Sequence, residues 1–268
     1  MKKIFNVPKY MFYKFSKNYI SWYEGFSYNQ KTNGEEYLLT NLQPFSPKVI
    51  FDVGANIGDW SAKSLELFKE ARIHCFEISA STFAHLQERF SREENVVLNQ
   101  CGLGKEKGEI LYKDYGVNKG VNTIITRADY HDDAITPEMK TTQILTGDMY
   151  CKNNKIRQID ILKIDVEGAE YWVLQGFSEM LSQGAIKVIQ FEYGYTSSDI
   201  GHLTKDYYEL LTGYGYEVGP LKPSGVLYGD FKYSLNDFRS GPNYVAVHSD
   251  YRDIINATAG IAILGFPK

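Results

Sequence analysis

Two glycines and a carboxylate lie close together in the segment Val49–Ser61. Asp52 is part of its apolar run, and the turn Gly54-Ala55-Asn56-Ile57-Gly58 follows that run directly. Glycines in such a turn let backbone N–H groups and a helix N-terminus approach a ligand closely. The spacing differs from the Gly-x-Gly-x-x-Gly pattern of dinucleotide binders. Because Asp52 favours a ligand with a positive group, we predict S-adenosylmethionine, which carries an ammonium and a sulfonium.

A second carboxylate, Glu77, ends the next apolar run, 19 positions after Gly58. In nucleotide-binding α/β folds an acidic residue at about this distance binds the ribose hydroxyls. A third run ends at Asn99, and Cys101 and Gly102 follow it. We expect this third turn to border the adenine of the same cofactor, although Cys101 fits a small buried residue equally well.

Three more carboxylates and a histidine follow the fourth and fifth apolar runs. Asp165 ends the fourth run and Glu167 lies just beyond it, while Glu192 ends the fifth run and His202 lies in the loop that follows. Ligands of open α/β sheets bind at the edge where the parallel strands end. If the methyl group of such a cofactor passes to a hydroxyl, a nearby residue must take the proton of that hydroxyl. We predict Asp165 as this base, with Glu167, Glu192 and His202 as the other candidates.

Asp165 has two further interpretations. Its carboxylate could hold the ammonium group of the cofactor instead of taking a proton. A divalent metal bridging Asp165, Glu167 and Glu192 could acidify the acceptor hydroxyl. No histidine or close acid pair completes a clear ligand set, so we do not predict a metal site.

Strand-like apolar runs alternate with amphipathic segments, which predicts an α/β fold with a mostly parallel sheet. We expect an N-terminal arm over residues 1–46, the main domain over 47–250 and an apolar tail over 251–268. Residues 105–146 are the least regular part, and we expect them to form an insert that covers the active site or binds the acceptor. The tail is expected either to pack on the domain or to form an oligomer contact.

Composition excludes several classes of protein. The chain has 268 residues, 43% of them hydrophobic, and a net charge of -4. This length allows one sizeable domain, and the charge argues against a nucleic-acid-binding surface. Three cysteines in no metal-ligand spacing are typical of a reduced, cytoplasmic protein. No apolar run approaches the roughly 20 residues of a membrane span.

The arm over residues 1–46 combines lysines with many aromatic side chains. Such a segment could lie on the surface of a membrane or clamp a substrate. We favour a simpler interpretation, in which the arm packs its aromatic rings on the main domain. The reason is that Asn, Gly and Pro interrupt the helical pattern.

Together these motifs resemble the FkbM family of S-adenosylmethionine-dependent methyltransferases. The matching segments are Phe51–Asp59, His74–Glu77, Asp160–Glu170 and Gln190–Glu192. The run Lys163–Glu170 is the most specific to the family, and the resemblance covers roughly residues 48–248. One departure is Leu145–Asp148, where the family usually has Thr-Leu-Asp.

The resemblance implies a Rossmann-like sheet of seven strands in the order 3-2-1-4-5-7-6, with strand seven antiparallel and helices on both faces. It implies methyl transfer to an oxygen of a sugar, a glycan or a hydroxylated natural product. Carried over by position, Asp52 and the turn Gly54–Gly58 would hold the methionine part of the cofactor. Glu77 would hold the ribose, and Asn99–Gly102 would border the adenine.

Two alternatives come from other classes of protein. The first is an NAD-dependent oxidoreductase, which would use the glycine turn and Glu77, but the Gly-x-Gly start and the third glycine are missing. The second is a binding module that keeps the methyltransferase fold without activity, because a fold does not guarantee function.

Overall fold

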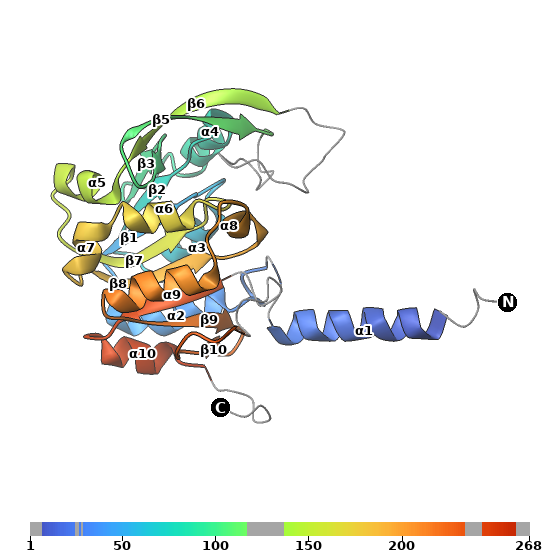
Figure 1. Ribbon diagram of the computed structural model, residues 1–268. Coiled ribbons are helices and arrows are strands. Elements are labelled where there is room, and N and C mark those ends of the chain that lie inside the picture. The colour runs from blue at the N-terminus through green and yellow to red at the C-terminus, as the bar shows by residue number, and fades with distance from the viewer. Residues whose placement is uncertain (1–6, 25–26, 28, 117–136, 234–242, 261–268) are drawn as a thin grey trace.

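The computed structural model describes residues 7–24, 27, 29–116, 137–233 and 243–260. Its core is an eight-stranded sheet in the order β10-β9-β11-β8-β7-β1-β2-β3 (Figure 1). Strands β3, β2, β1, β7 and β8 run parallel, and β11 is antiparallel to both of its neighbours. The strands are β1 (Val49–Val53), β2 (Arg72–Phe76), β3 (Val96–Asn99), β7 (Ile159–Ile164), β8 (Ile186–Glu192), β9 (Tyr216–Lys222), β10 (Gly225–Val226) and β11 (Asn243–His248).

The order expected for seven strands is confirmed, with β11 as the antiparallel strand between β8 and β9. The expected number of strands was too low by one. Two residues, Gly225 and Val226, fold back on β9 and add β10 at that edge. Gly225 has a φ of 119°, which glycine adopts without a steric penalty and which makes this sharp return feasible.

The register of the parallel strands brings the predicted carboxylates to one edge. Val53 lies opposite Phe76 of β2 and Ile164 of β7. Ile164 in turn lies opposite Phe191 of β8. Glu77 and Asp165 directly follow two of these paired residues, and Glu192 ends β8. These carboxylates therefore meet at the carboxyl edge of the sheet, as expected from the sequence.

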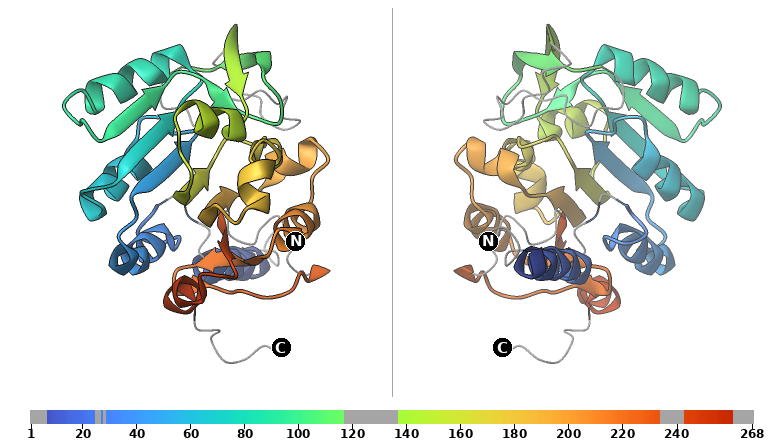
Figure 2. Two further views of the ribbon diagram at one scale, coloured as in Figure 1. Left: turned by 90° about the vertical axis from the view of Figure 1, so that its left-hand side faces the viewer. Right: turned by 90° about the vertical axis from the view of Figure 1, so that its right-hand side faces the viewer.

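Helices cover both faces of the sheet, as the two side views show (Figure 2). Neighbouring residues of β1 point to opposite faces, so Ile50 and Phe51 belong to different hydrophobic clusters. Buried side chains of one group of helices pack with Ile50: α2 (Glu35–Leu42), α3 (Asp59–Leu67), α4 (Ala80–Arg89) and α10 (Arg252–Thr258). Those of a second group pack with Phe51: α5 (Gly147–Asn153), α6 (Glu170–Gln175), α7 (Ser178–Ser182) and α9 (Thr204–Gly213).

A second sheet of three strands lies beside the first. It contains β4 (Gly102–Leu103), β5 (Gly108–Asp114) and β6 (Glu138–Leu145) in the order β4-β6-β5. β5 and β6 pair antiparallel, with Asp114 opposite Glu138. The expected insert thus contributes a β-ribbon, while residues 117–136, with His131 and its acidic neighbours, lie outside the described residues.

The N-terminal arm differs from the expectation. Residues Val7–Glu24 form a continuous helix, α1, that projects from the body of the molecule (Figure 1). Pro8 does not interrupt it, because a proline is tolerated in the first turn of a helix. The aromatic side chains are exposed instead of packed on the domain; Phe12 is 72% exposed and Trp22 is 74% exposed. The interpretation of a packed arm was therefore wrong for this helix.

The tail packs on the domain over its described part. Ile254 and Ile255 of α10 are buried, and α10 contacts α2. Residues 261–268 of the expected tail lie outside the described residues. Among the residues that the structure describes, no helix has the length and apolar character needed to cross a membrane.

Candidate active site

Three residues of the glycine turn have a left-handed backbone. Gly54, Asn56 and Gly58 have φ values of 86°, 49° and 83°. The N–H groups of Gly54 and Ala55 both donate to the carbonyl of Phe76, which ties the turn to β2. A Cβ at Gly54 would lie 1.8 Å from the carbonyl oxygen of Asp165. The turn therefore packs directly against the backbone that follows β7.

Asp52 is fully buried beneath this turn. Its Oδ2 accepts a hydrogen bond of 2.7 Å from the hydroxyl of Ser61 on α3. Its Oδ1 lies 3.7 Å from Nζ of Lys163. Burial raises the pKa of Asp52, and the ammonium of Lys163 opposes that shift. Both carboxylate oxygens of Asp52 thus face protein groups, Ser61 and Lys163. The contact of Asp52 with the cofactor stays a prediction.

Glu77 links the end of β2 to the glycine turn. One carboxylate oxygen accepts the N–H of Asn56 at 2.9 Å, and the other accepts the N–H of Ser79 at 2.8 Å. Burial raises the pKa of Glu77 to about 7, although these hydrogen bonds act against it. An ionised carboxylate has about four acceptor sites. The backbone N–H of Ile78 is a further hydrogen-bond partner of Glu77. An acceptor site that these backbone groups leave free would suit a hydroxyl of a ribose, which donates.

The third predicted turn is only partly directed at a ligand. The amide nitrogen of Asn99 donates to the carbonyl of Cys75 at 3.0 Å, and its oxygen accepts the hydroxyl of Tyr150 at 3.1 Å. Cys101 is part-buried and packs against the core, and burial raises the pKa of its thiol to about 11. Gly102 begins β4. The adenine contact predicted for these residues stays untested.

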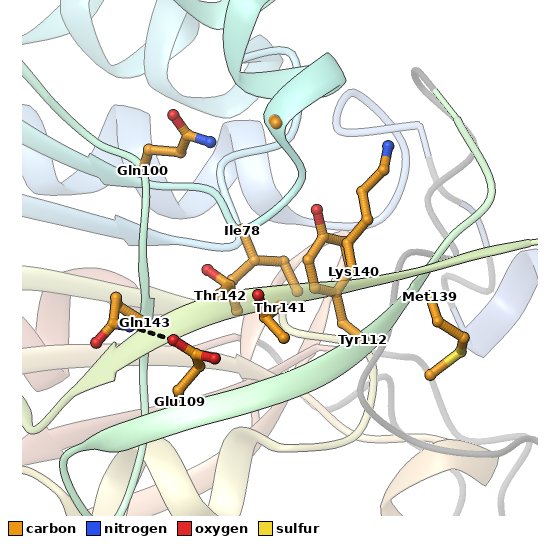
Figure 3. Close-up of a pocket in the computed structure, with 10 residues that line it drawn as sticks. Ile78, Gln100, Glu109, Tyr112, Met139, Lys140, Thr141, Thr142 and Gln143 are labelled. Carbon is orange, nitrogen blue, oxygen red and sulfur yellow. Dashed lines mark hydrogen bonds between the residues drawn. The ribbon is translucent and has the colours of Figure 1, made fainter.

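A pocket of about 590 Å³ lies between the turn after β2 and the β5–β6 ribbon (Figure 3). Ile78 and Gln100 line it from the side of the main sheet, and Tyr112 and Lys140 line it from the ribbon. Ile78 directly follows Glu77, so the pocket adjoins the residue predicted to hold the ribose. An insert over residues 105–146 was expected, but the sequence did not show that it would line a pocket here.

Asp165 and Glu192 form a carboxyl pair at the ends of β7 and β8. Nζ of Lys163 donates to Oδ2 of Asp165 at 3.0 Å, and the carboxyl of Glu192 is hydrogen-bonded to Asp165. Burial alone would raise the pKa of Asp165, but Lys163 and Glu192 hold that pKa below its usual value. Burial and the negative charge of Asp165 raise the pKa of Glu192 well above its usual value. Of the two carboxyl groups, Asp165 is therefore the more acidic one, and Glu192 is the one that holds a proton to higher pH.

Lys163 is a charged residue of this candidate site that the sequence reasoning did not single out. It is buried between the carboxylates of Asp52 and Asp165. Burial lowers the pKa of its ammonium, and the two carboxylates more than compensate, so that the pKa is raised. A signal was present in the sequence, because a lysine in the apolar run 159–164 is costly to bury without a partner.

Two carboxylates, Glu167 and Glu170, follow Asp165 in the same turn. Glu170 is buried, and its Oε1 accepts the N–H groups of Val166 and Gly168 at 3.0 Å each. It therefore closes the turn after Asp165, within which Glu167 has a left-handed φ of 59°. Burial raises the pKa of Glu170 to about 7.

His202 stacks on Tyr171, with ring centroids 4.0 Å apart, and its Nδ1 lies 3.9 Å from Asp206. Burial lowers the pKa of His202, and Asp206 partly offsets that shift. Within the described part of the chain, no hydrogen bond joins His202 to Asp165 or Glu192. The structure thus brings Asp165 and Glu192 together and gives His202 other partners.

A metal centre has little support from the donor set. No group of three or more His, Cys, Asp or Glu side chains suited to a metal ion lies in the part of the chain that the structure describes. Asp165 already bonds an ammonium and a carboxyl group. These bonds leave it a poor member of an all-oxygen metal site.

The strand order, the antiparallel β11 and the carboxylates at the carboxyl edge define a Rossmann-like methyltransferase fold. The methyltransferase FkbM domain matches residues 52–218, which is more than half of the chain. This protein therefore belongs to the FkbM family of S-adenosylmethionine-dependent class I methyltransferases.

Individual relatives are distant. The hexuronic acid methyltransferase AglP of Haloferax volcanii is 24% identical over 160 residues, which are 59% of this chain and 62% of that protein. Methyltransferase 1 of Beauveria bassiana is 26% identical over 155 residues, 52% of this chain and 62% of that protein. The chain thus spans about three fifths of the length of these two relatives.

A solved structure, the methyltransferase FkbM of Methylobacillus flagellatus, is 17% identical to this chain with a TM-score of 0.45. The match covers 76% of this chain and 44% of that one.

Proposed function

We propose that this protein transfers a methyl group from S-adenosylmethionine to an oxygen of a sugar, a glycan or another hydroxylated small molecule. The observation that carries the proposal is the carboxyl pair at the edge of the sheet. Asp165 is held ionised, and 35% of its side chain is exposed. An ionised, reachable carboxylate beside the glycine turn can accept the hydrogen bond, and then the proton, of an acceptor hydroxyl.

The residues around the pair suit the cofactor. The turn Gly54–Gly58 would hold the methionine part, since no side chain fits between Gly54 and the backbone of Asp165. An acceptor site of Glu77 that the backbone leaves free would bind the ribose. Ile78 and the pocket beside it would take the flat adenine ring. Asp52 would act through Lys163, because both lie beneath the turn.

The chain would contribute mainly alignment to the reaction. When bound, S-adenosylmethionine supplies a methyl group on a positively charged sulfur. Asp165 orients the acceptor hydroxyl toward that methyl group. Good orientation of two reactants lowers the activation barrier by about 7 kcal/mol or more. Because the pKa of Asp165 is low, it accepts the proton late, when the new bond makes the oxygen acidic. Glu192 donates to Asp165 and so fixes the direction of its carboxylate.

One relative suggests which class of acceptor to test first. The name of AglP assigns it a hexuronic acid as substrate. Uronic acids and their glycans are therefore the first acceptors to test, followed by neutral sugars and hydroxylated natural products. A uronic acid offers both hydroxyl and carboxylate oxygens, so the position of the new methyl group needs to be determined.

Calorimetry with S-adenosylhomocysteine tests the cofactor site. Glu77→Gln removes acceptor capacity from the ribose position, and hydrogen bonds to charged groups contribute roughly 1.5–3 kcal/mol. We expect its affinity for S-adenosylhomocysteine to fall by about tenfold or more. Glu88→Gln on the exposed face of α4 is the matched control and should leave the affinity unchanged. Equal affinities in both variants and the wild type would discard this assignment of the ribose.

Turnover with an acceptor panel tests the reaction. Labelled S-adenosylmethionine should give a product with the mass gain of one methyl group, located on oxygen by fragmentation. A thermal shift with NAD but none with S-adenosylhomocysteine would favour the oxidoreductase instead. Strong binding of S-adenosylhomocysteine without product from any acceptor would favour the inactive binding module.

A further inference from the structure

Helix α1 carries a stripe of apolar side chains along one side. Met11, Phe12, Phe15 and Trp22 are between 65% and 74% exposed. Tyr19, which is 55% exposed, lies beside Trp22 with ring centroids 5.9 Å apart and the ring planes tilted by 44°. Residues spaced by three and four lie on the same face of a helix. The spacing Phe12, Phe15, Tyr19, Trp22 therefore forms one continuous stripe.

The opposite side of α1 carries lysines together with the exposed rings of Tyr10 and Tyr13. Lys9, Lys14 and Lys17 lie away from the stripe, and the ammonium groups of Lys14 and Lys17 lie over the rings of Tyr10 and Tyr13 at 5.0 and 5.7 Å. The first 23 residues of the chain hold five lysines and no Asp, Glu or Arg. This segment is positive while the whole chain has a net charge of -4.

We propose that α1 lies in the interface of an anionic lipid surface and holds the protein there. Helices with Phe and Trp on one side and lysines on the other commonly lie in the plane of a membrane interface. The stripe would enter the boundary of the acyl chains, and the lysines would contact anionic headgroups. A partner protein with an apolar groove would explain the stripe but leaves the absence of acidic residues in residues 1–23 unexplained.

The position of α1 suits this role. It leaves the body on the same side as α8 (Tyr195–Asp199), the helix that follows Glu192 at the end of β8 (Figure 1). Its apolar stripe can therefore be buried in lipid without disturbing the core of the domain. The proposal concerns attachment and stands independently of the reaction proposed above.

Vesicle sedimentation with the full chain tests the proposal. We expect binding to vesicles of equal parts phosphatidylglycerol and phosphatidylcholine, weakened by salt, and much weaker binding to phosphatidylcholine alone. A triple change of Lys9, Lys14 and Lys17 to Gln should weaken binding to the anionic vesicles by roughly a hundredfold, because each lysine near such a surface contributes about 1 kcal/mol.

A matched pair of variants separates the stripe from the rest of the helix. Phe12→Ser with Phe15→Ser should reduce vesicle binding by more than about tenfold, because two buried rings are lost. Tyr10→Ser with Tyr13→Ser removes two rings from the opposite side and should have a small effect. Thermal unfolding of the domain should be unchanged in both.

Two outcomes would overturn the proposal. The first is equal vesicle binding by the two double variants. The second is absence of binding to anionic vesicles at low salt. In that case, self-association in analytical ultracentrifugation that is lost in the phenylalanine variant would assign the stripe to a second copy of the chain.

Discussion

At the scale of single residues, one buried ammonium organises the charges of the site. Lys163 lies between Asp52 and Asp165, and a buried charge of this kind persists only when it is paired. The ammonium of Lys163 holds the pKa of Asp165 below its usual value, while burial and the charge of Asp165 raise the pKa of Glu192. The geometry makes Asp165 the candidate base and gives Glu192 the role of holding it in place.

Asp165→Asn tests this division of roles. The amide cannot accept a proton, and general bases typically contribute at least about a hundredfold to rate. We expect kcat to fall by about that factor or more while the affinity for S-adenosylhomocysteine stays within a few-fold. Activity and affinity that fall together would assign Asp165 to the ammonium of the cofactor, and unchanged turnover would remove it from the mechanism.

Asp160→Asn is the matched control on the same strand. Asp160 lies at the amino end of β7, where Oδ2 accepts the N–H groups of Lys48 and Val49 at 2.7 and 2.9 Å. Its loss should lower the stability of the fold without lowering kcat, because it lies at the opposite end of the strand from Asp165.

At the scale of elements, the site depends on two turns that pack against each other. The glycine turn follows β1, the turn closed by Glu170 follows β7, and these strands are neighbours. Gly54 has a φ of 86° and leaves no space for a Cβ against the carbonyl of Asp165. The two turns therefore hold each other in position.

Gly54→Ala should separate the turns. The Cβ would collide with backbone, which cannot move aside cheaply, and the positive φ adds strain of about 1–3 kcal/mol. We expect a clearly lower Tm and loss of S-adenosylhomocysteine binding. Gly213→Ala at the end of α9 is the control, because no atom lies within 4 Å of the added Cβ. A Gly54→Ala variant with wild-type Tm and affinity would show that this close packing is dispensable.

At the scale of the whole molecule, buried acids make stability depend on pH. Burial raises the pKa of Glu170 from 4.5 to about 7. Between these values the folded state binds more protons than the unfolded state, so the contribution of Glu170 to stability falls as pH rises through this window. Glu77 acts in the same direction, while His74, whose pKa is lowered to about 4, acts in the opposite one.

Glu170→Gln isolates one of these contributions. The amide oxygen can still accept the N–H groups of Val166 and Gly168, but the side chain no longer ionises. We expect the wild type to lose stability relative to this variant between about pH 5 and about pH 8, by at most roughly 3 kcal/mol. Urea unfolding at both values measures the difference. If the stabilities of the wild type and the variant change with pH in the same way, ionisation of Glu170 does not destabilise the folded state.

The linear sequence determined most of the scaffold and the location of the site. The apolar runs predicted the strands of the main sheet, and Asp52, Glu77, Asp165 and Glu192 were expected at one edge. This inference succeeds because parallel strands joined by right-handed crossovers end at the same edge. The FkbM motifs also indicated the family without any structure.

Only the tertiary structure decided which groups face each other. The pairing of Ile164 with Phe191 sets Asp165 beside Glu192, and the pleat turns Lys163 toward Asp52. Whether α1 packs on the domain or projects from it was likewise not encoded in its local pattern. Such outcomes depend on contacts between segments far apart in the chain, and local spacing carries no information about them.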